Sequence, residues 1–161
     1  MNGTRRVAIA LGSNSPDRAD MLQSAGAALD DLEEVRVLVR SRIEETEAFG
    51  PPQPSFLNRM VMVETSLSLS ALLASLQRIE LAHGRQRLVA KGPRTLDLDI
   101  VWAEAEVHTN ADLLVPHPGL NDRDFWQREL RQLLGAESAA AIASAQVHAG
   151  METGRPAGVA S

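Results

Sequence analysis

Apolar residues recur along this sequence alternately at the spacing of strands and at the spacing of helices. Stretches that predict strands cover residues 7–11, 35–45, 56–65 and 96–102. Between them, apolar residues at helical spacing predict helices over about 15–32 and 69–83. The order β-α-β-β-α-β is typical of a ferredoxin-like sandwich, in which helices cover a face of a mainly antiparallel sheet. The sequence therefore predicts an α+β fold of this class.

The ends of the predicted helices carry their own signals. Ser15 is placed to be the N-cap of the first helix, with Pro16 as its first residue. The second helix has the strongest amphipathic pattern in the chain; Ser68 or Ser70 caps it, and it ends near Gly84. Beyond the fourth strand we expect a short strand at 105–108, a loop at 113–120 and one or two short helices over 121–134.

Composition places the chain among ordinary globular domains. Its 161 residues are 44% apolar, which is enough for a single core, and we expect one domain over residues 1–134. Residues 135–161 are rich in Ala, Gly and Ser, which predicts a mobile tail with room for one helix at 137–146. The sequence contains no cysteine, and this excludes cysteine nucleophiles, Cys-ligated zinc and disulfides.

Charge and the first residues limit the expected partners. A net charge of −5 argues against non-specific binding to nucleic acid, because that affinity comes from many Lys and Arg contacts to phosphates. The apolar stretch 7–11 is too short for a signal-peptide core or a membrane span. We therefore expect a cytoplasmic monomer that acts on small molecules, without a nucleic-acid or membrane partner.

Two carboxylates interrupt the fourth predicted strand. Asp97 and Asp99 flank Leu98, so the strand period places both on one face, about 6.6 Å apart along the chain. Carboxylates this close repel each other unless a cation lies between them, and Mg²⁺ accepts one or two carboxylates together with water and phosphate oxygens. An exposed face with two solvated aspartates explains the spacing equally well, so the spacing alone leaves both interpretations open.

A basic run lies just before these carboxylates. Arg85, Arg87, Lys91 and Arg94 are four of the sixteen Lys and Arg residues, gathered within ten positions of an acidic chain. Arg and Lys beside paired acids suit a site that holds phosphate and a metal ion together. Taken alone, the run is also explained by a solvated loop. The sequence contains no Walker A pattern, no dinucleotide glycine fingerprint and no zinc-protease motif.

Residues suited to a flat heterocycle share a face of the third predicted strand. Period two places Phe56 and Asn58 on one side of it, together with Met60 and Met62. A flat aromatic ring beside an amide that both donates and accepts hydrogen bonds fits such a ligand, although core packing is the simpler role for Phe56. On its own the sequence assigns His117, in the predicted loop 113–120, a structural role.

Several separated motifs resemble one known family. The run Lys91-Gly92-Pro93-Arg94-Thr95-Leu96-Asp97-Leu98-Asp99-Ile100-Val101 resembles the signature of hydroxymethyl-dihydropterin pyrophosphokinase, a folate-biosynthesis enzyme. The resemblance continues, in the same order, in Ala10-Leu11-Gly12-Ser13-Asn14, Phe56-Leu57-Asn58, Gln77-Arg78-Ile79-Glu80 with Gly84, Arg85 and Arg87, and Val115-Pro116-His117 with Arg123 and Phe125. Together these motifs cover about residues 7 to 130.

The resemblance implies a reaction and its metal. The family transfers the terminal diphosphate of ATP to the hydroxymethyl oxygen of 6-hydroxymethyl-7,8-dihydropterin, which gives AMP and the pterin diphosphate. Two magnesium ions are implied, held by Asp97 and Asp99, and Asp97 is also implied to orient the attacking hydroxyl. The remaining implied ATP contacts are Arg85 and Arg94 on the moving phosphates, Arg87 on a catalytic loop, and Gln77, Glu80, His117 and Arg123 around the nucleotide.

The resemblance also implies a pterin site. Phe56 and Phe125 would stack on the two faces of the pterin ring. Asn58, with backbone groups near Thr46 and Phe49, would bind the hydrogen-bonding edge of the ring.

The chain departs from the family pattern in three places, one of which is the tail past Gly135, and rival functions remain open. The loop at 85–93 is one residue shorter than in well-known members, with Lys91 where some carry Trp, and residues 126–131 are more polar than the usual apolar run. A ferredoxin-like RNA-binding or regulatory domain would share the element order, but it predicts a basic surface and no acidic pair. A family member that binds pterin or ATP and turns over poorly is the second alternative.

Overall fold

The computed structural model describes residues 3–48, 50, 52–84 and 96–135. Its elements, in chain order, are β1 (Arg5–Ser13), α1 (Arg18–Asp30), β2 (Val35–Arg40), β3 (Glu44–Thr46), β4 (Phe56–Thr65), α2 (Leu69–Ala82), β5 (Asp97–Ala103), β6 (His108–Thr109), β7 (Leu114–Val115), the 3₁₀ helix η1 (Pro118–Asn121) and α3 (Asp124–Leu134). Among these, no helix has the length and apolar character needed to span a bilayer.

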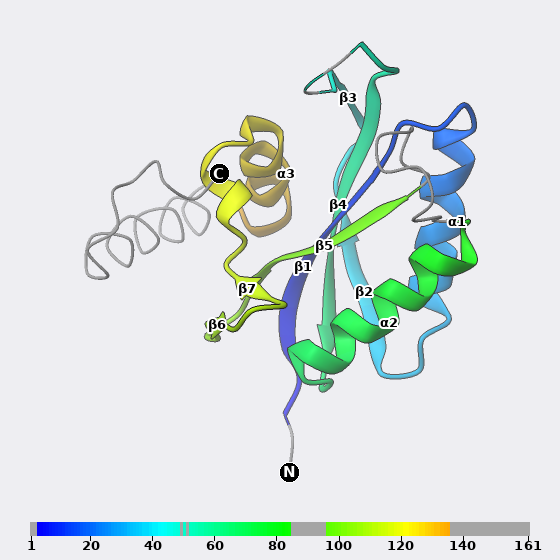
Figure 1. The fold of residues 1–161 in the computed structure, drawn as a ribbon. Helices are drawn as coiled ribbons and strands as arrows, with labels where there is room; N and C mark the ends of the chain where they lie inside the picture. Colours follow the sequence, from blue (N-terminus) through cyan, green and yellow to red (C-terminus); the bar gives the residue numbers. More distant parts are fainter. Residues whose placement is uncertain (1–2, 49, 51, 85–95, 136–161) are drawn as a thin grey trace.

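The main sheet has the predicted ferredoxin-like arrangement. Its strands lie in the order β2-β4-β1-β5, neighbouring strands are antiparallel, and β3 extends the sheet on β4. Figure 1 shows α1 and α2 together on one face and α3 on the opposite face. The predicted α+β class is thus confirmed, and the third helix adds a layer on the second face.

The central strand β1 separates two hydrophobic cores. Its large residues Val7, Ile9 and Leu11 pack on the face that α1 and α2 cover. Its small residues Ala8 and Ala10 face the other way and pack with residues of β4 and α3, among them Met60, Met62, Trp126 and Leu130. Because successive strand residues point to opposite faces, this alternation places Phe56 and Asn58 on the α3 side as well. The predicted shared face of residues 56, 58, 60 and 62 is therefore confirmed.

The segment predicted as one strand over 35–45 forms two, β2 and β3. Ser41 is the reason for the interruption, because its hydroxyl accepts a hydrogen bond from the Met60 N–H at 2.9 Å, while its backbone N–H donates to the Met60 carbonyl at 2.8 Å. The guanidinium of Arg59 also donates to the Ser41 carbonyl, at 2.9 Å. A side chain thus takes part in the ladder at this point, and regular pairing resumes only at Glu44.

The predicted ends of α2 are confirmed, whereas α1 begins later than the sequence predicts. Ser68 caps α2, with its hydroxyl accepting from the Ala71 N–H at 3.1 Å, and Gly84 follows the helix with a φ of 84°, as predicted. Helix α1 starts two residues later than predicted, at Arg18. The Ser15 hydroxyl instead donates to the Asp17 carboxylate, and its carbonyl accepts from the Arg18 N–H, so residues 15–17 form a turn before the helix.

Smaller differences lie beyond β5. The short strand predicted at 105–108 is β6 at His108–Thr109, and it pairs with β7 inside the segment predicted as loop. The predicted helical segment at 121–134 contains one α-helix, α3. The predicted tail and its helix at 137–146 lie outside the described residues.

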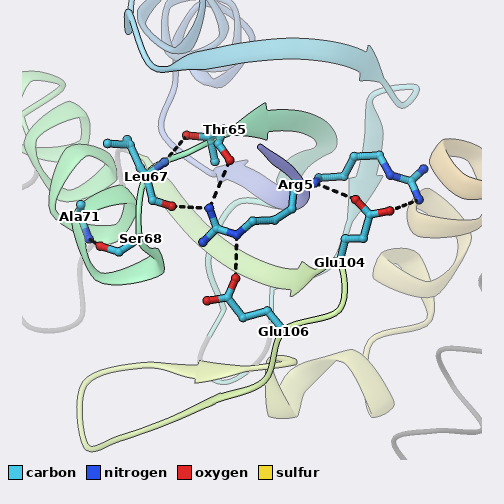
Figure 2. Close-up of polar contacts among 8 residues, drawn as sticks. Arg5, Thr65, Leu67, Ser68, Ala71, Glu104 and Glu106 are labelled. Carbon is cyan, nitrogen blue, oxygen red and sulfur yellow. Dashed lines mark hydrogen bonds and ion pairs between the residues drawn. The ribbon is translucent and has the colours of Figure 1, made fainter. Parts of the chain in front are cut away.

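Arg5 ties together three segments at the end of the sheet where β1 begins (Figure 2). Its Nε donates to the Glu106 carboxylate at 2.6 Å, and its Nη1 donates to the carbonyls of Thr65 and Leu67. Thr65 ends β4 and Leu67 leads into α2, while Glu106 follows β5, so one guanidinium connects segments far apart in the sequence. The Arg5 side chain is only 18% exposed, which keeps water from replacing these bonds easily.

We expect Arg5→Ala to lower the free energy of unfolding by about 1–3 kcal/mol, because two backbone carbonyls and a carboxylate lose their donor. Arg36→Ala is the matched control, since Arg36 forms an ion pair with Glu64 but is 72% exposed, and it should cost less than about 0.5 kcal/mol. Urea unfolding of both variants measures the difference, and unchanged m-values would show that only stability has changed. Equal losses would show that Arg5 contributes no more than a surface charge.

Candidate active site

Two residues of the predicted site lie on either side of Gly12, across neighbouring strands. In the β1–β4 register Gly12 pairs with Asn58, and in the β1–β5 register the same Gly12 pairs with Asp97. Residues paired in register point to the same face, and strands lie about 4.8 Å apart. The amide of Asn58 and the carboxylate of Asp97 thus occupy the α3 side of the sheet, with one residue between them.

Gly12 keeps the space between these two side chains open. A Cβ built on Gly12 would lie 3.1 Å from the Asn58 Oδ1 and 3.8 Å from the Phe56 Cδ1. Any side chain at this position would therefore displace the Asn58 amide and approach the Phe56 ring. The sheet forms a floor here, with an amide and an aromatic ring at one side and a carboxylate at the other.

Asn58 is held in place by a residue of β3. Its Nδ2 donates to the Thr46 Oγ1 at 2.6 Å, and Thr46 itself pairs with Phe56 in the β3–β4 register. Asn58 is buried, with 7% of its surface exposed, so the amide orientation is fixed by this bond. Thr46, Phe56 and Asn58, three of the predicted pterin residues, are thus neighbours in space.

Asp97 and Asp99 are both half-buried, and a third carboxylate supports the strand that carries them. The Leu98 N–H, between the two aspartates, donates to the Glu80 Oε2 at 2.8 Å. Glu80 is buried on α2, on the side of the sheet opposite to α3. Its bond fixes the backbone of β5 where the two aspartates project from it.

The carboxylates suit a magnesium ion in kind and number. Asp97 and Asp99 offer oxygen ligands on one face of β5, and Mg²⁺ commonly takes one or two carboxylates and completes its shell with water and phosphate oxygens. The described residues contain no group of three or more acidic or histidine side chains that could hold a metal ion by itself, here or elsewhere, so phosphate oxygens would have to supply further ligands. The residues present therefore fit magnesium bound jointly by protein and phosphate.

His117 presents a neutral imidazole to this carboxylate pair. Its Nδ1 accepts a hydrogen bond from the Gly119 N–H at 2.9 Å, which leaves the proton on Nε2, and Nε2 lies 3.9 Å from the Asp99 Oδ1. Burial, and secondarily the charge of Arg123, lowers the pKa of His117 to about 4. The site thus offers an N–H donor that carries no charge at neutral pH.

Trp126 links His117, Arg123 and Phe125 in one aromatic cluster. The His117 ring meets the Trp126 ring edge-on at 4.9 Å between centroids, and the Phe125 ring lies 6.3 Å from it. The Arg123 guanidinium stacks 4.2 Å from the Trp126 centroid. This tryptophan belongs to α3 and is buried, so it orients three predicted site residues without being one of them.

Of the other predicted site residues, two lie on α2 and the rest fall outside the described residues. Gln77 is exposed on α2, and Glu80 on the same helix contacts the β5 backbone as described above. Phe49, Arg85, Arg87, Lys91 and Arg94 lie outside the described residues. The functions of Gly12, Trp126 and the Glu80 hydrogen bond were not predicted, because they depend on strand register and helix packing that no local pattern reveals.

A family model matches most of the chain. The model of 7,8-dihydro-6-hydroxymethylpterin-pyrophosphokinase matches residues 8–135, which include every described residue of the site.

Curated relatives agree with this match. The chain is 44% identical over 118 residues to the 2-amino-4-hydroxy-6-hydroxymethyldihydropteridine pyrophosphokinase of Bacillus subtilis, covering 73% of this chain and 71% of that one. It is 40% identical over 114 residues to the Pseudomonas putida protein of the same name, covering 71% of this chain and 95% of that one. The folic acid synthesis protein fol1 of Schizosaccharomyces pombe is 41% identical over 126 residues; these cover 78% of this chain but only 17% of the yeast protein.

The pKa of His117 is directly measurable by ¹⁵N NMR of the metal-free protein. We expect a neutral ring with the proton on Nε2 at pH 6 and a titration midpoint near 4. Because the folded-state pKa lies below the ordinary value, the free energy of unfolding should fall as the pH drops from about 6.5 toward 4. Arg123→Gln should raise the midpoint only partly, since burial is the larger cause; a midpoint near 6.5 in the unmodified protein would contradict this account.

Proposed function

Because the chain belongs to the 7,8-dihydro-6-hydroxymethylpterin-pyrophosphokinase family, we propose that it transfers diphosphate from ATP to 6-hydroxymethyl-7,8-dihydropterin in folate biosynthesis. The products are AMP and the pterin diphosphate. The observation that supports the proposal is the row Asn58–Gly12–Asp97, in which an amide suited to a heterocycle and a carboxylate suited to a metal ion are neighbours within the matched residues.

The pterin ring is proposed to lie over Gly12. Phe56 on β4 and Phe125 in the first turn of α3 belong to the same side of the sheet, as stacking on the two faces of one ring requires. Asn58, fixed by Thr46, supplies donor and acceptor groups for the ring edge, and backbone groups near Phe49 complete that edge. The hydroxymethyl group would then point toward Asp97, across the space that Gly12 leaves open.

Asp97 and Asp99 are proposed to hold two magnesium ions together with ATP. When bound, the ions would neutralise phosphate charge and align the transferred group. The Asp97 carboxylate, next to the pterin floor, would also accept a hydrogen bond from the attacking hydroxyl and orient it. Glu80 contributes by holding the backbone between the two aspartates, and this is the role we propose for it at the ATP site.

The phosphates and the nucleotide are proposed to meet neutral and charged donors. His117 offers its Nε2–H beside Asp99, and Arg123 is held over Trp126 close to it. Gln77, Arg85, Arg87 and Arg94 complete this set through the family resemblance. Alignment and charge stabilisation account for most of the rate in such a site, and exclusion of water prevents simple hydrolysis of ATP.

The proposal extends to the setting in which the chain works. A single catalytic domain over residues 1–134, followed by a tail, would act as a monomer in the cytoplasm. The lack of cysteine in the sequence suits a reducing compartment.

The reaction is tested by the products formed from ATP, Mg²⁺ and 6-hydroxymethyl-7,8-dihydropterin. We expect AMP only when the pterin is present, and no ADP. Asp97→Asn and Asp99→Asn should each lower the rate at least about 100-fold, because charge stabilisation at the phosphates is lost. Asp20→Asn is the control and should keep full activity, because Asp20 is exposed on α1.

The two rival functions give different results in this assay. Pterin binding by calorimetry without AMP formation would favour a binding protein of low turnover. Formation of ADP, or neither activity nor binding, would overturn the proposed reaction.

Gly12→Ala tests the floor of the pterin site. The new Cβ would lie 3.1 Å from the Asn58 Oδ1, so the amide must shift, and pterin affinity should fall at least about tenfold while binding of an ATP analogue is unchanged. Gly26→Ala is the control, since a Cβ there meets nothing within 4 Å and α1 should be slightly stabilised. Unchanged pterin affinity in Gly12→Ala would show that the ring binds elsewhere.

A further inference from the structure

Three buried carboxylate oxygens near the proposed pterin site accept no hydrogen bond from a donor group among the described residues. They are both oxygens of Glu129, on α3, and the Oε2 of Glu44, on β3. Glu129 is fully buried, with 0% of its surface exposed. The other oxygen of Glu44 accepts from the Arg128 Nε at 3.1 Å. Glu44 lies within hydrogen-bond reach of Glu129. Two acidic side chains therefore meet between β3 and α3, and among the described residues only one of their four oxygens has a donor.

One proton shared by the two carboxyl groups would give these oxygens a hydrogen-bond donor and remove one of the two negative charges. An ionised carboxylate only accepts hydrogen bonds, whereas a protonated one also donates. One proton on Glu129 lets it donate to Glu44, and Arg128 then offsets the single negative charge that remains. Burial, followed by the hydrogen bond and charge of Glu44, raises the pKa of Glu129 to about 9, while Arg128 acts in the opposite direction.

Among the residues that the structure describes, few other charged groups face this pair. The β4 residues on the side that α3 covers next to it, Phe56, Asn58, Met60 and Met62, are uncharged. From the segment between β2 and β3, Arg42 donates its backbone N–H to Gln132 of α3 at 3.1 Å, while its side chain is exposed. On α3 itself, Asp124 and Arg131 are exposed. The protonation state of the pair thus depends chiefly on Glu44, Glu129 and Arg128.

The pair lies next to both walls of the proposed pterin site. Glu44 pairs with Asn58 in the β3–β4 register and precedes Thr46 by two residues on the same strand, so all three share a face. Glu129 follows Phe125 by four residues, one turn further along the same side of α3. A contact between Glu44 and Glu129 therefore sets the position of Phe125 relative to Asn58 and Thr46.

We propose that Glu44 and Glu129 are positioning residues, which share one proton and thereby hold α3 against β3 at the distance that pterin binding requires. The inference rests on the proposed pterin substrate. When the pH rises through about 9, Glu129 ionises beside Glu44, and two like charges then face each other in a buried contact. Because the folded-state pKa is raised, the contribution of this proton to folding is complete below about 4.5 and is lost as the pH rises through about 9.

The pH dependence of pterin affinity tests the proposal. In calorimetry from pH 6.5 to 9.5, the pterin dissociation constant of the unmodified protein should rise about threefold to fourfold, which is close to the most that a group with a pKa of about 9 can give by pH 9.5, while that of an ATP analogue stays constant. Glu129→Gln places a permanent donor against Glu44, so its pterin affinity should be within about twofold of normal at pH 7 and should not change up to pH 9.5. In turnover, the pterin KM should follow the same pattern, with kcat unaffected.

Matched variants separate this effect from titration of the pterin itself. Glu33→Gln, on the exposed turn after α1, should keep the pH dependence of the unmodified protein. Glu44→Gln provides a donor from the other side and should also remove the pH dependence. A rise that persists in Glu129→Gln, or no rise in the unmodified protein, would overturn the proposal.

A second measurement does not require a bound substrate. In ¹³C NMR of the protein labelled at glutamate Cδ, one carboxyl should titrate with a midpoint near 9, and this signal should be missing in Glu129→Gln. If the signal is present but no pterin binds at any pH, the proposed function fails and the shared proton stands. If every glutamate titrates below about 6, the shared proton is excluded, whether or not pterin binds.

Discussion

Strand β1 is hydrogen-bonded along both of its edges and buried on both of its faces, and every other element is placed relative to it. Its registers with β4 and β5 decide which side chains become neighbours. The large residues on one face and the small residues on the other let α1 and α2 pack on the first face while α3 packs closely on the second. The site exists because this strand ends its α3 face with Gly12, where the neighbouring strands contribute Asn58 and Asp97.

The two ends of the sheet serve different purposes. At the end where β1 begins, polar groups are joined by direct bonds, and Arg5 connects three segments there. At the end where β1 finishes, hydrogen bonds from neighbouring elements hold the site residues in place. Thr46 of β3 accepts a hydrogen bond from Asn58, and Glu80 of α2 accepts one from the backbone of the strand that carries Asp97. These bonds fix Asn58 and the backbone of β5 before any ligand binds, which is how pre-organised sites are built.

The sequence predicts the secondary-structure elements, and which side chains share a strand face, better than it predicts how separate elements pair with one another. Helix α2, strand β4 and the common face of Phe56 and Asn58 follow from local periodicity, and the paired aspartates stand out within one strand. The register that aligns Asn58 with Asp97 through Gly12 depends on pairing between segments tens of residues apart, which no local pattern encodes. The break at Ser41 and the meeting of Glu44 with Glu129 likewise arise from tertiary contacts, where packing overrides local preference.

The double pairing of β1 also affects the order in which the chain can be completed during synthesis. Strand β1 ends at Ser13, and the strand that covers its second edge begins at Asp97. At about 5–20 residues per second, a ribosome needs on the order of ten seconds to make the intervening segment. Throughout that time an apolar strand presents unpaired N–H and C=O groups along one edge, a state that favours association with other chains. The segment that carries the two aspartates thus also closes the last open edge of the central strand.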